Sequence, residues 1–492
     1  MMFKPATLFV AVSLTASVGN FATAEDFFLT IGGGYTQTEN QVSLENNVRL
    51  FQRTLADLHL GERSNDIYFS DGADSTPDVQ VVDPQSVPKA NRLMAEFFGS
   101  DDDLGLFYRN HQIPRVRAAA SPANIRQWFA ETGSRMKSGD RLVLYVTAHG
   151  HRSDDRNNAF NTSIATWNNT SVKMAEFVRM LDRLPAGVQV VTIMVQCYAG
   201  GFARYIFNDG DPARGVSRQA RCGFFATVHD RPAAGCTPEV DEASYVEYST
   251  YFFAALSGQD RSGAAIRAPD YNSDGVVSFD EAHAYTMLTA DTIDVPVTTS
   301  SEFLDVNSRI GAAESDLLTD AEPYDRILSL ATPSESAILE GLSEQLGLTG
   351  SDRVSTARRE AQPRRGRGRF RGRRRNDPAD ELRRRIAADL EKRWPELANL
   401  LNPGAIDLLT VRSSEFIAAL EGHPDYSRYR ALADNRQPVA DEQKRIVKYE
   451  RFLRIADNVV LAENLKRIGD SEMLKQFQAI VRGESGTLSN GK

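Results

Sequence analysis

The sequence predicts an α/β fold in which a mostly parallel sheet is covered by helices on both faces, followed by a C-terminal helical region. Three observations support this prediction. Between residues 25 and 310, continuously apolar, β-branched segments alternate with segments of helical periodicity. An arginine-rich stretch at residues 358–375 then interrupts the chain. Beyond it, apolar residues recur at intervals of three and four, as they do in amphipathic helices.

The first residues have the layout of a secretory signal. Lys4 precedes an apolar run over residues 7–18, and small residues at 22–24 precede the acidic Glu25. This layout predicts that residues 1–24 are removed and that the protein is exported, either to the periplasm or outside the cell. A membrane anchor is the alternative, but the run is short for a span of about 20 residues. We therefore expect no membrane span after removal of the signal.

Strands and helices alternate through the next part of the chain. We expect strands in the segments 26–35, 65–72, 140–150, 188–197 and 223–230. We expect helices in the segments 41–60, 121–137, 173–184 and 247–258. The Pro- and Asp-containing stretch from about 71 to 90 is typical of a long surface loop.

The composition changes sharply after residue 310. An acidic, Ser- and Leu-rich segment from about 311 to 350, which we expect to be partly helical, precedes residues 358–375, where arginine occupies ten of eighteen positions and glycine is interleaved. Such a segment buries almost nothing, so we expect it to be disordered within a linker over 311–378. A helical domain is expected over 379–492. The net charge of −9 argues against general nucleic-acid binding, so any polyanion binding must be local to 358–375.

Two of the predicted strands end in residues that together can perform acyl transfer. One ends at His149 and Gly150, and the next ends at Cys197 within a turn of small residues. The carboxyl ends of neighbouring parallel strands meet at one edge of a sheet, so imidazole and thiol are expected to lie close together. The Gly150 and Cys197 N–H groups are candidates for an oxyanion hole. His151 competes for the role of base, but only His149 is followed directly by glycine.

The two strand ends also match the pattern of a known peptidase family. LVLYVTAHG, followed about fifty residues later by VTIMVQCYAGGF, resembles the caspase and legumain-like cysteine peptidases, which include metacaspases and gingipains. The resemblance covers roughly residues 25–310 and implies a caspase-like three-layer sandwich. It also implies His149 as general base or acid, Cys197 as nucleophile, and a protein or peptide as substrate. Ala148 and the turn after Gln196 match no single subfamily, so cut-site specificity is not inherited from any one of them.

Three further functional hypotheses follow from this resemblance. Relatives that cut after arginine or lysine carry an acidic residue in the pocket, and Asp230 is our candidate, with Asp154 or Asp155 as alternatives. Basic specificity would make the segment 358–375 a site of self-cleavage. A catalytically inactive binding or scaffold protein, or a transpeptidase or transamidase, remains an alternative with the same residues.

The chain contains only three cysteines, Cys197, Cys222 and Cys236. Export permits disulfides, so the simplest arithmetic pairs Cys222 with Cys236 and leaves Cys197 as the free nucleophile. Three free thiols buried as small apolar side chains are the alternative.

Residues 270–281 read DYNSDGVVSFDE and have the spacing of a calcium loop of the EF-hand type. Oxygen ligands are expected at alternate positions, and Gly275 permits the sharp turn. The segment before the loop contains Pro269 and reads as a loop, so we expect half of an EF-hand with a structural Ca²⁺. The expected ligands are Asp270, Asn272, Asp274, the Val276 carbonyl, Ser278 and Glu281.

Overall fold

The computed structural model describes residues 24–61, 65–101, 103–242, 245–308, 317–319, 321–362, 378–433 and 438–488. A seven-stranded sheet contains β1 (Asp26–Gly33), β2 (Asn65–Phe69), β5 (Val116–Ala118), β6 (Arg141–Ala148), β10 (Gln189–Met194), β11 (Arg221–Phe225) and β12 (Val297–Thr298). Their order is β12-β11-β10-β6-β1-β2-β5, and every neighbouring pair is parallel except β11 and β12. The predicted signal lies outside the described residues apart from Ala24.

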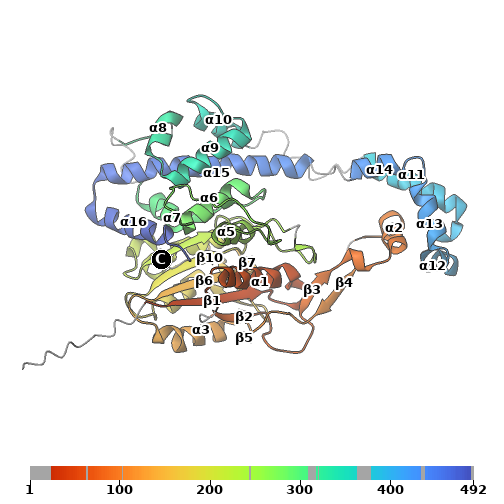
Figure 1. Ribbon diagram of the computed structural model, residues 1–492, viewed down its shortest axis with the longest axis horizontal. Coiled ribbons are helices and arrows are strands. Elements are labelled where there is room, and N and C mark those ends of the chain that lie inside the picture. Colours follow the sequence, from red (N-terminus) through yellow and green to blue (C-terminus); the bar gives the residue numbers. More distant parts are fainter. Residues whose placement is uncertain are drawn as a thin grey trace, which may run out of the picture.

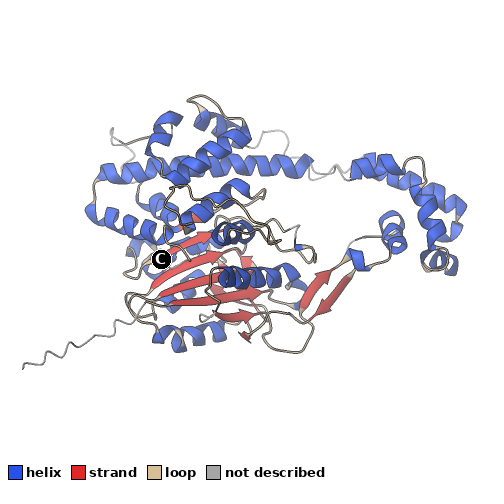
Figure 2. Ribbon diagram, in the orientation of Figure 1, coloured by secondary structure: helices blue, strands red, loops and turns tan. Residues whose placement is uncertain are grey.

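Helices cover both faces of this sheet and give three layers (Figures 1 and 2). One face carries α3 (Pro122–Glu131), α4 (Met174–Leu181), the 3₁₀ segment η4 (Ala199–Ile206), α7 (Thr299–Asn307) and α16 (Ser471–Glu484). The other carries α1 (Val42–Asp57), α5 (Tyr248–Ser257) and α6 (Phe279–Thr289). The α/β prediction is confirmed.

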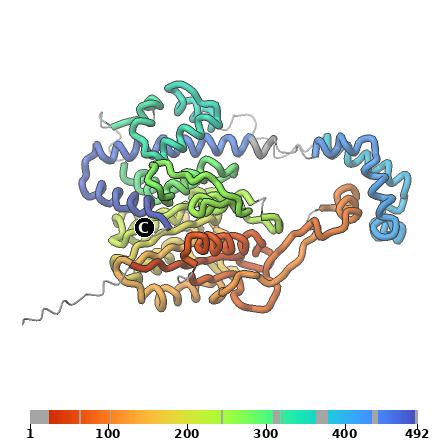
Figure 3. Tube along the Cα trace, viewed as in Figure 1, coloured from red at the N-terminus to blue at the C-terminus, as the bar shows by residue number. Residues whose placement is uncertain are grey.

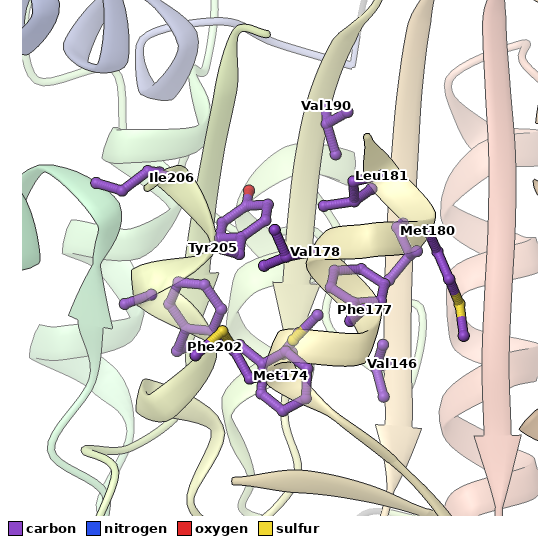
Figure 4. Packing of buried hydrophobic residues seen from close by; sticks show 14 of the residues in the cluster. Val146, Met174, Phe177, Val178, Met180, Leu181, Val190, Phe202, Tyr205 and Ile206 are labelled. Carbon is purple, nitrogen blue, oxygen red and sulfur yellow. The ribbon is translucent and has the colours of Figure 1, made fainter. Parts of the chain in front are cut away.

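Alternation along the strands explains why both faces are apolar. In β6, Leu142, Leu144 and Val146 belong to the core under α3 and α4, whereas Val143 and Tyr145 belong to the core under α1 and α5. A strand buried on both faces therefore reads as one continuous apolar run. Figure 4 shows the first of these cores, where side chains of α4 and η4 pack together beside the strands.

Two smaller sheets extend from the central one. The antiparallel strands β3 (Val79–Val82) and β4 (Leu106–Arg109) are joined through the 3₁₀ turn η2 (Pro84–Ser86) and α2 (Lys89–Phe98). The strands β7 (Gly150–His151), β8 (Ser163–Thr166) and β9 (Thr170–Lys173) form a three-stranded antiparallel sheet directly after β6. The expected surface loop at 71–90 was therefore wrong in part: Val79 and Val81 are buried beneath α1.

The C-terminal half forms two helical groups. In the first, α8 (Tyr324–Leu330), α9 (Pro333–Leu346) and α10 (Arg353–Ala361) share a core with α6 and α15 (Pro438–Ile468). Apolar residues of α9 at helical spacing are buried there, so the segment 311–378, expected to be a linker, contains packed helices. The segment expected to be disordered, 358–375, begins inside α10, and residues 363–377 lie outside the described residues.

The second helical group lies at one end of the long axis of the molecule, on the right in Figure 1. It contains α11 (Pro378–Arg393), α12 (Pro403–Leu409), α13 (Ser413–Glu421) and α14 (Tyr426–Ala433), which pack with α2 around one core. The long helix α15 runs from this side of the molecule across the helices that cover the sheet (Figures 1 and 3). Among the described helices, none is long and apolar enough to cross a membrane.

Candidate active site

The strand register brings the His149 and Cys197 segments to the same edge of the sheet. Val146 of β6 pairs with Met194 of β10, so His149 and Cys197 each lie three residues beyond a paired position. A Cβ atom placed on Gly150 would lie 2.0 Å from the carbonyl oxygen of Cys197. Only glycine permits this close approach of two backbones. The amides of Gly150 and Cys197, the expected oxyanion donors, thus belong to touching segments.

The imidazole of His149 is held in one orientation by the loop after β1. Its Nε2 lies 2.9 Å from the carbonyl oxygen of Glu39 and 2.9 Å from Oε1 of Gln41. Both partners are acceptors, so Nε2 carries the proton and Nδ1 presents its lone pair. Burial lowers the pKa of His149, which favours the neutral base. The ring of Tyr35 packs edge-on against it at 5.5 Å.

Cys197 lies at the start of a strained turn. Tyr198, the next residue, has φ 61° and ψ 18°, a left-handed conformation that is uncommon outside glycine. The Sγ atom of Cys197 accepts a hydrogen bond from the Ala233 N–H at 3.3 Å. Burial raises the pKa of the Cys197 thiol, whereas the Ala233 N–H lowers it. The amide of Ala233 therefore stabilises the thiolate of Cys197.

The thiol of Cys236 lies next to the imidazole. Its Sγ is 3.7 Å from Nδ1 of His149, and since Nδ1 is unprotonated the thiol is the donor. The residue as a whole is exposed, yet the burial of its thiol raises the pKa to about 12. Cys236 is consequently a neutral thiol at physiological pH. It lies three residues beyond Ala233, so one loop contacts both candidate catalytic groups.

The structure contradicts the predicted disulfide between Cys222 and Cys236, because all three cysteines are free. Cys222 is buried in β11, where it pairs with Val191, and a Cβ on Gly483 of α16 would lie 2.8 Å from its sulfur. Cys236 lies instead beside His149, beyond the carboxyl edge of the sheet. The two cysteines are close in sequence but not in space. Cys222 lies near the start of β11, whereas Cys236 lies in the loop beyond the carboxyl end of this strand.

The carboxylates proposed for a specificity pocket have different surroundings. Asp154 is an exposed partner of Lys173 at 2.8 Å, and Asp155 accepts a hydrogen bond from the Asn157 N–H at 2.9 Å. Asp230 instead lines a cavity of about 440 Å³ between the turn after Cys197 and α15. Neither His149 nor Cys197 lines this cavity, but Gly200 does. His151 is exposed at the outer side of Tyr35.

This cavity is rich in charged side chains. Five carboxylates and two guanidinium groups line it, those of Asp230, Glu302, Asp305, Glu450, Asp457, Arg231 and Arg454. Arg231 is paired with Glu450, and Arg454 with Asp305. Glu302 and Asp457 are paired in turn with Arg204 and Arg358, so four of the five carboxylates have arginine partners.

The predicted calcium loop has a compact conformation. The carboxylate of Asp270 accepts hydrogen bonds from the N–H groups of Asp274 and Gly275, which fold the chain around it. Gly275 has φ +87°, as the sharp turn requires. Glu281 is buried, and its oxygens accept from the N–H groups of Tyr271, Asn272 and Ser278. Over the described residues, no group of three or more His, Cys, Asp or Glu side chains converges as a metal site.

Sequence reasoning missed three parts of this site. Gln41 orients the imidazole, Cys236 contacts its Nδ1, and Ala233 donates to the nucleophile. The rarity of cysteine was the one available signal for Cys236. No sequence signal connects the amide of Ala233 to a sulfur located 36 residues earlier.

Comparison with known proteins adds little about the chemistry. No protein-family model matches the chain, and no curated protein matches it significantly. Among solved structures, the chain is similar to the crystal structure of protein GSU0716 from Geobacter sulfurreducens. That similarity covers 54% of this chain and 88% of the other, at 9% sequence identity and a TM-score of 0.30.

Proposed function

We propose that this protein is an exported cysteine endopeptidase in which Cys197 is the nucleophile and His149 is the base. The observation that supports the proposal most strongly is the orientation of His149. Its Nε2–H is donated to Glu39 and Gln41, so the lone pair on Nδ1 is available as a base and is contacted by the Cys236 thiol. A neutral imidazole with a fixed tautomer, next to a nucleophile turn, suits acyl transfer.

In the proposed reaction the Cys236 thiol first leaves Nδ1 of His149, and this nitrogen then accepts the proton of the Cys197 thiol. The thiolate then attacks the substrate carbonyl, and the resulting oxyanion accepts hydrogen bonds from the Gly150 and Cys197 amides. Collapse of this intermediate breaks the C–N bond, and Nδ1–H protonates the departing amine. Water, deprotonated by Nδ1, hydrolyses the thioester and regenerates the thiol. Because burial raises the thiol pKa and lowers the imidazole pKa, the resting pair is neutral.

Specificity for basic residues is the second part of the proposal. Asp230 lines the same cavity as Gly200, which lies three residues after Cys197. A guanidinium or ammonium group requires carboxylate partners when it leaves water. The arginine-rich segment 358–375 is then the natural site of self-processing. We further propose that residues 270–281 bind a structural Ca²⁺ through the ligands expected from their spacing. The carboxylates do not converge in this structure, so Asp270 and Glu281 must exchange their present N–H partners for the ion.

The experiment compares three cysteine variants of the mature protein on a diverse peptide library, with and without Ca²⁺. Cys197→Ala abolishes cleavage, whereas Cys236→Ala retains it and Cys222→Ala serves as the matched control. Cleavage by Cys197→Ala that is lost in Cys236→Ala would assign the chemistry to the other thiol. If the active wild type cleaves the library but leaves the bonds after arginine and lysine uncut, the proposed specificity is wrong. The N-terminal sequence of the secreted protein tests removal of residues 1–24.

One observation favours the alternative of an inactive binding or scaffold protein. The thiol within hydrogen-bonding distance of His149 is that of Cys236. If this arrangement is permanent, no peptide is cut under any condition and Cys197 reacts with electrophiles as an ordinary thiol. A transpeptidase would show itself by product in which an added amine replaces water.

A further inference from the structure

A loop from the middle of the chain covers the sulfur of Cys197. Its backbone touches the nucleophile turn twice: the Arg231 carbonyl accepts from the Tyr198 N–H at 2.9 Å, and the Ala233 N–H donates to Cys197 Sγ at 3.3 Å. We call residues 231–236 the thiol loop. The Ala233 amide is the N–H donor to this sulfur among the described residues, so its position determines how well the thiolate is stabilised.

Helix α15 holds one end of the thiol loop. The carboxylate of Glu450 forms a two-point contact with the guanidinium of Arg231, at 2.5 and 2.9 Å. This planar pairing fixes orientation as well as distance. The Arg231 and Glu450 side chains are 42% and 25% exposed, so the pair can be altered without opening the core. The contact joins residues 219 positions apart in the chain.

The same helix holds the middle of the thiol loop through a second, buried route. Arg451 is fully buried and donates to the carbonyls of Met287, Ala290 and Asp294 and to the Thr292 hydroxyl. These contacts fix the segment after α6. Its Asp294 is 1% exposed, and Oδ1 accepts from the Ala234 N–H at 2.7 Å. Two successive residues of α15 thus support residues 231 and 234, on either side of Ala233.

The charges around the sulfur make its reactivity sensitive to this support. Asp294 and Cys236 are the titratable groups that interact with the Cys197 thiol, and His149 lies beyond Cys236. Burial and the carboxylate of Asp294 oppose ionisation of Cys197, and the Ala233 amide favours it. A small displacement of that amide removes the stabilising contact and leaves the opposing ones. The thiolate then forms at higher pH.

We propose that Glu450 and Asp294 are positioning residues for Cys197: they hold the thiol loop so that the Ala233 amide stabilises the thiolate. Helix α15 then positions the loop that contacts the nucleophile. The inference rests on the proposed function only for its consequence in peptide cleavage, since thiol reactivity is measured without substrate.

The experiment is the pH dependence of alkylation of Cys197 by iodoacetamide, followed by mass spectrometry of the tryptic peptide 184–204. That peptide contains Cys197 and no other cysteine, whereas Cys222 and Cys236 fall together on another. The variant Glu450→Ala is compared with Glu463→Ala, a matched change on α15 at a residue whose ion pairs within the described part of the chain are with Lys466 and Arg467 of the same helix. Far-ultraviolet circular dichroism and thermal unfolding verify folding.

We expect Glu450→Ala to raise the pH of the inflection by about one unit, which slows alkylation at pH 7 about tenfold. Glu463→Ala leaves the profile unchanged. The charge swap Arg231→Glu with Glu450→Arg restores it, because the pair is partly exposed and either polarity can form. Asp294→Asn and Asp294→Ala remove the same charge, but only asparagine keeps an acceptor for the Ala234 amide. The alanine variant therefore has the higher inflection of the two.

A Glu450→Ala profile that coincides with wild type, or coincident profiles for the two Asp294 variants, would overturn the positioning role of that residue. Should the Asp294 variants fail to fold beside the buried Arg451, the Glu450 series decides the question alone. Peptide cleavage is measured in parallel. If wild type cleaves no peptide but Glu450→Ala still shifts the alkylation profile, the proposed function is refuted and the positioning role of Glu450 stands. If Glu450→Ala shifts neither the alkylation profile nor the cleavage of peptides by an active wild type, the positioning role is refuted and the proposed function stands.

Discussion

Substitution of Gly150 by alanine tests the geometry on which the candidate site depends. The added Cβ would lie 2.0 Å from the Cys197 carbonyl oxygen and 2.9 Å from Cγ of Gln196. Ordinary contacts between heavy atoms begin at about 3.5 Å, so the two strand ends must separate by roughly 1 Å or more. The closest obstructing atom belongs to backbone between two core strands and cannot rotate away.

Two magnitudes follow from this displacement. Overpacking of a close-packed site costs about 1–3 kcal/mol of the free energy of unfolding. A misplacement of about 1 Å between reacting groups lowers the rate of a positioned reaction by about 100-fold. We therefore expect Gly150→Ala to remain folded, to unfold at a lower temperature, and to lose peptide cleavage about 100-fold.

The assay combines thermal unfolding with peptide cleavage and with alkylation of Cys197. Gly61→Ala is the matched control, because its added Cβ would meet only Ala56 of α1, at 3.5 Å or more. If Gly150→Ala had the stability and the Cys197 reactivity of wild type, the two strand ends would not be in contact. The close approach of His149 and Cys197 would then have to be abandoned.

Three further predictions concern pH and calcium. Burial lowers the pKa of His149, so the acid limb of cleavage against pH lies below the ordinary histidine value of about 6.5, and an inflection above it would contradict the buried imidazole. Burial raises the pKa of Glu484 to about 7. Between about pH 4.5 and 7 the folded state therefore binds more protons than the unfolded state, and the free energy of unfolding falls as the pH rises through this window. Glu484→Gln, which keeps an acceptor for Thr299 and Ser300, should raise the unfolding temperature at pH 8 and leave it nearly unchanged at pH 5; destabilisation at both would disprove this. Ca²⁺ at about 100 times its Kd should stabilise the wild type by about 2.7 kcal/mol and Asp270→Ala by much less, with Asp260→Ala, a similar aspartate turn outside the motif, as control; equal gains in all three would exclude the loop 270–281.

Some elements were readable from sequence because their signal is local. The strand β10 and the turn after it combine a continuous apolar run with an abrupt change to small residues, and a strand buried on both faces produces no other pattern. The helix α3 lies within the predicted segment 121–137, and it begins with Pro122 directly after Ser121, whose hydroxyl caps it. These features depend only on neighbouring residues.

Other elements were missed because their signal depends on distant partners. The strand β3 has polar, Pro-containing surroundings and is stabilised by burial of Val79 and Val81 under α1. Partial helix was expected around α8 and α9, but not the burial of apolar side chains of α8, α9 and α10 against α15, about 100 residues later. Composition alone cannot report such a partner.

The sequence by itself determined that His149 and Cys197 each follow a continuously apolar segment, the pattern of a strand buried on both faces. The tertiary structure decided that these two strands are neighbours in the sheet. Only the tertiary structure decided which thiol contacts Nδ1 of His149, and which amide contacts Cys197. The physical reason is that the thiol loop has no regular hydrogen-bonding pattern of its own. It is held by contacts with residues distant in the sequence, among them Glu450 of α15 and Asp294 after α6.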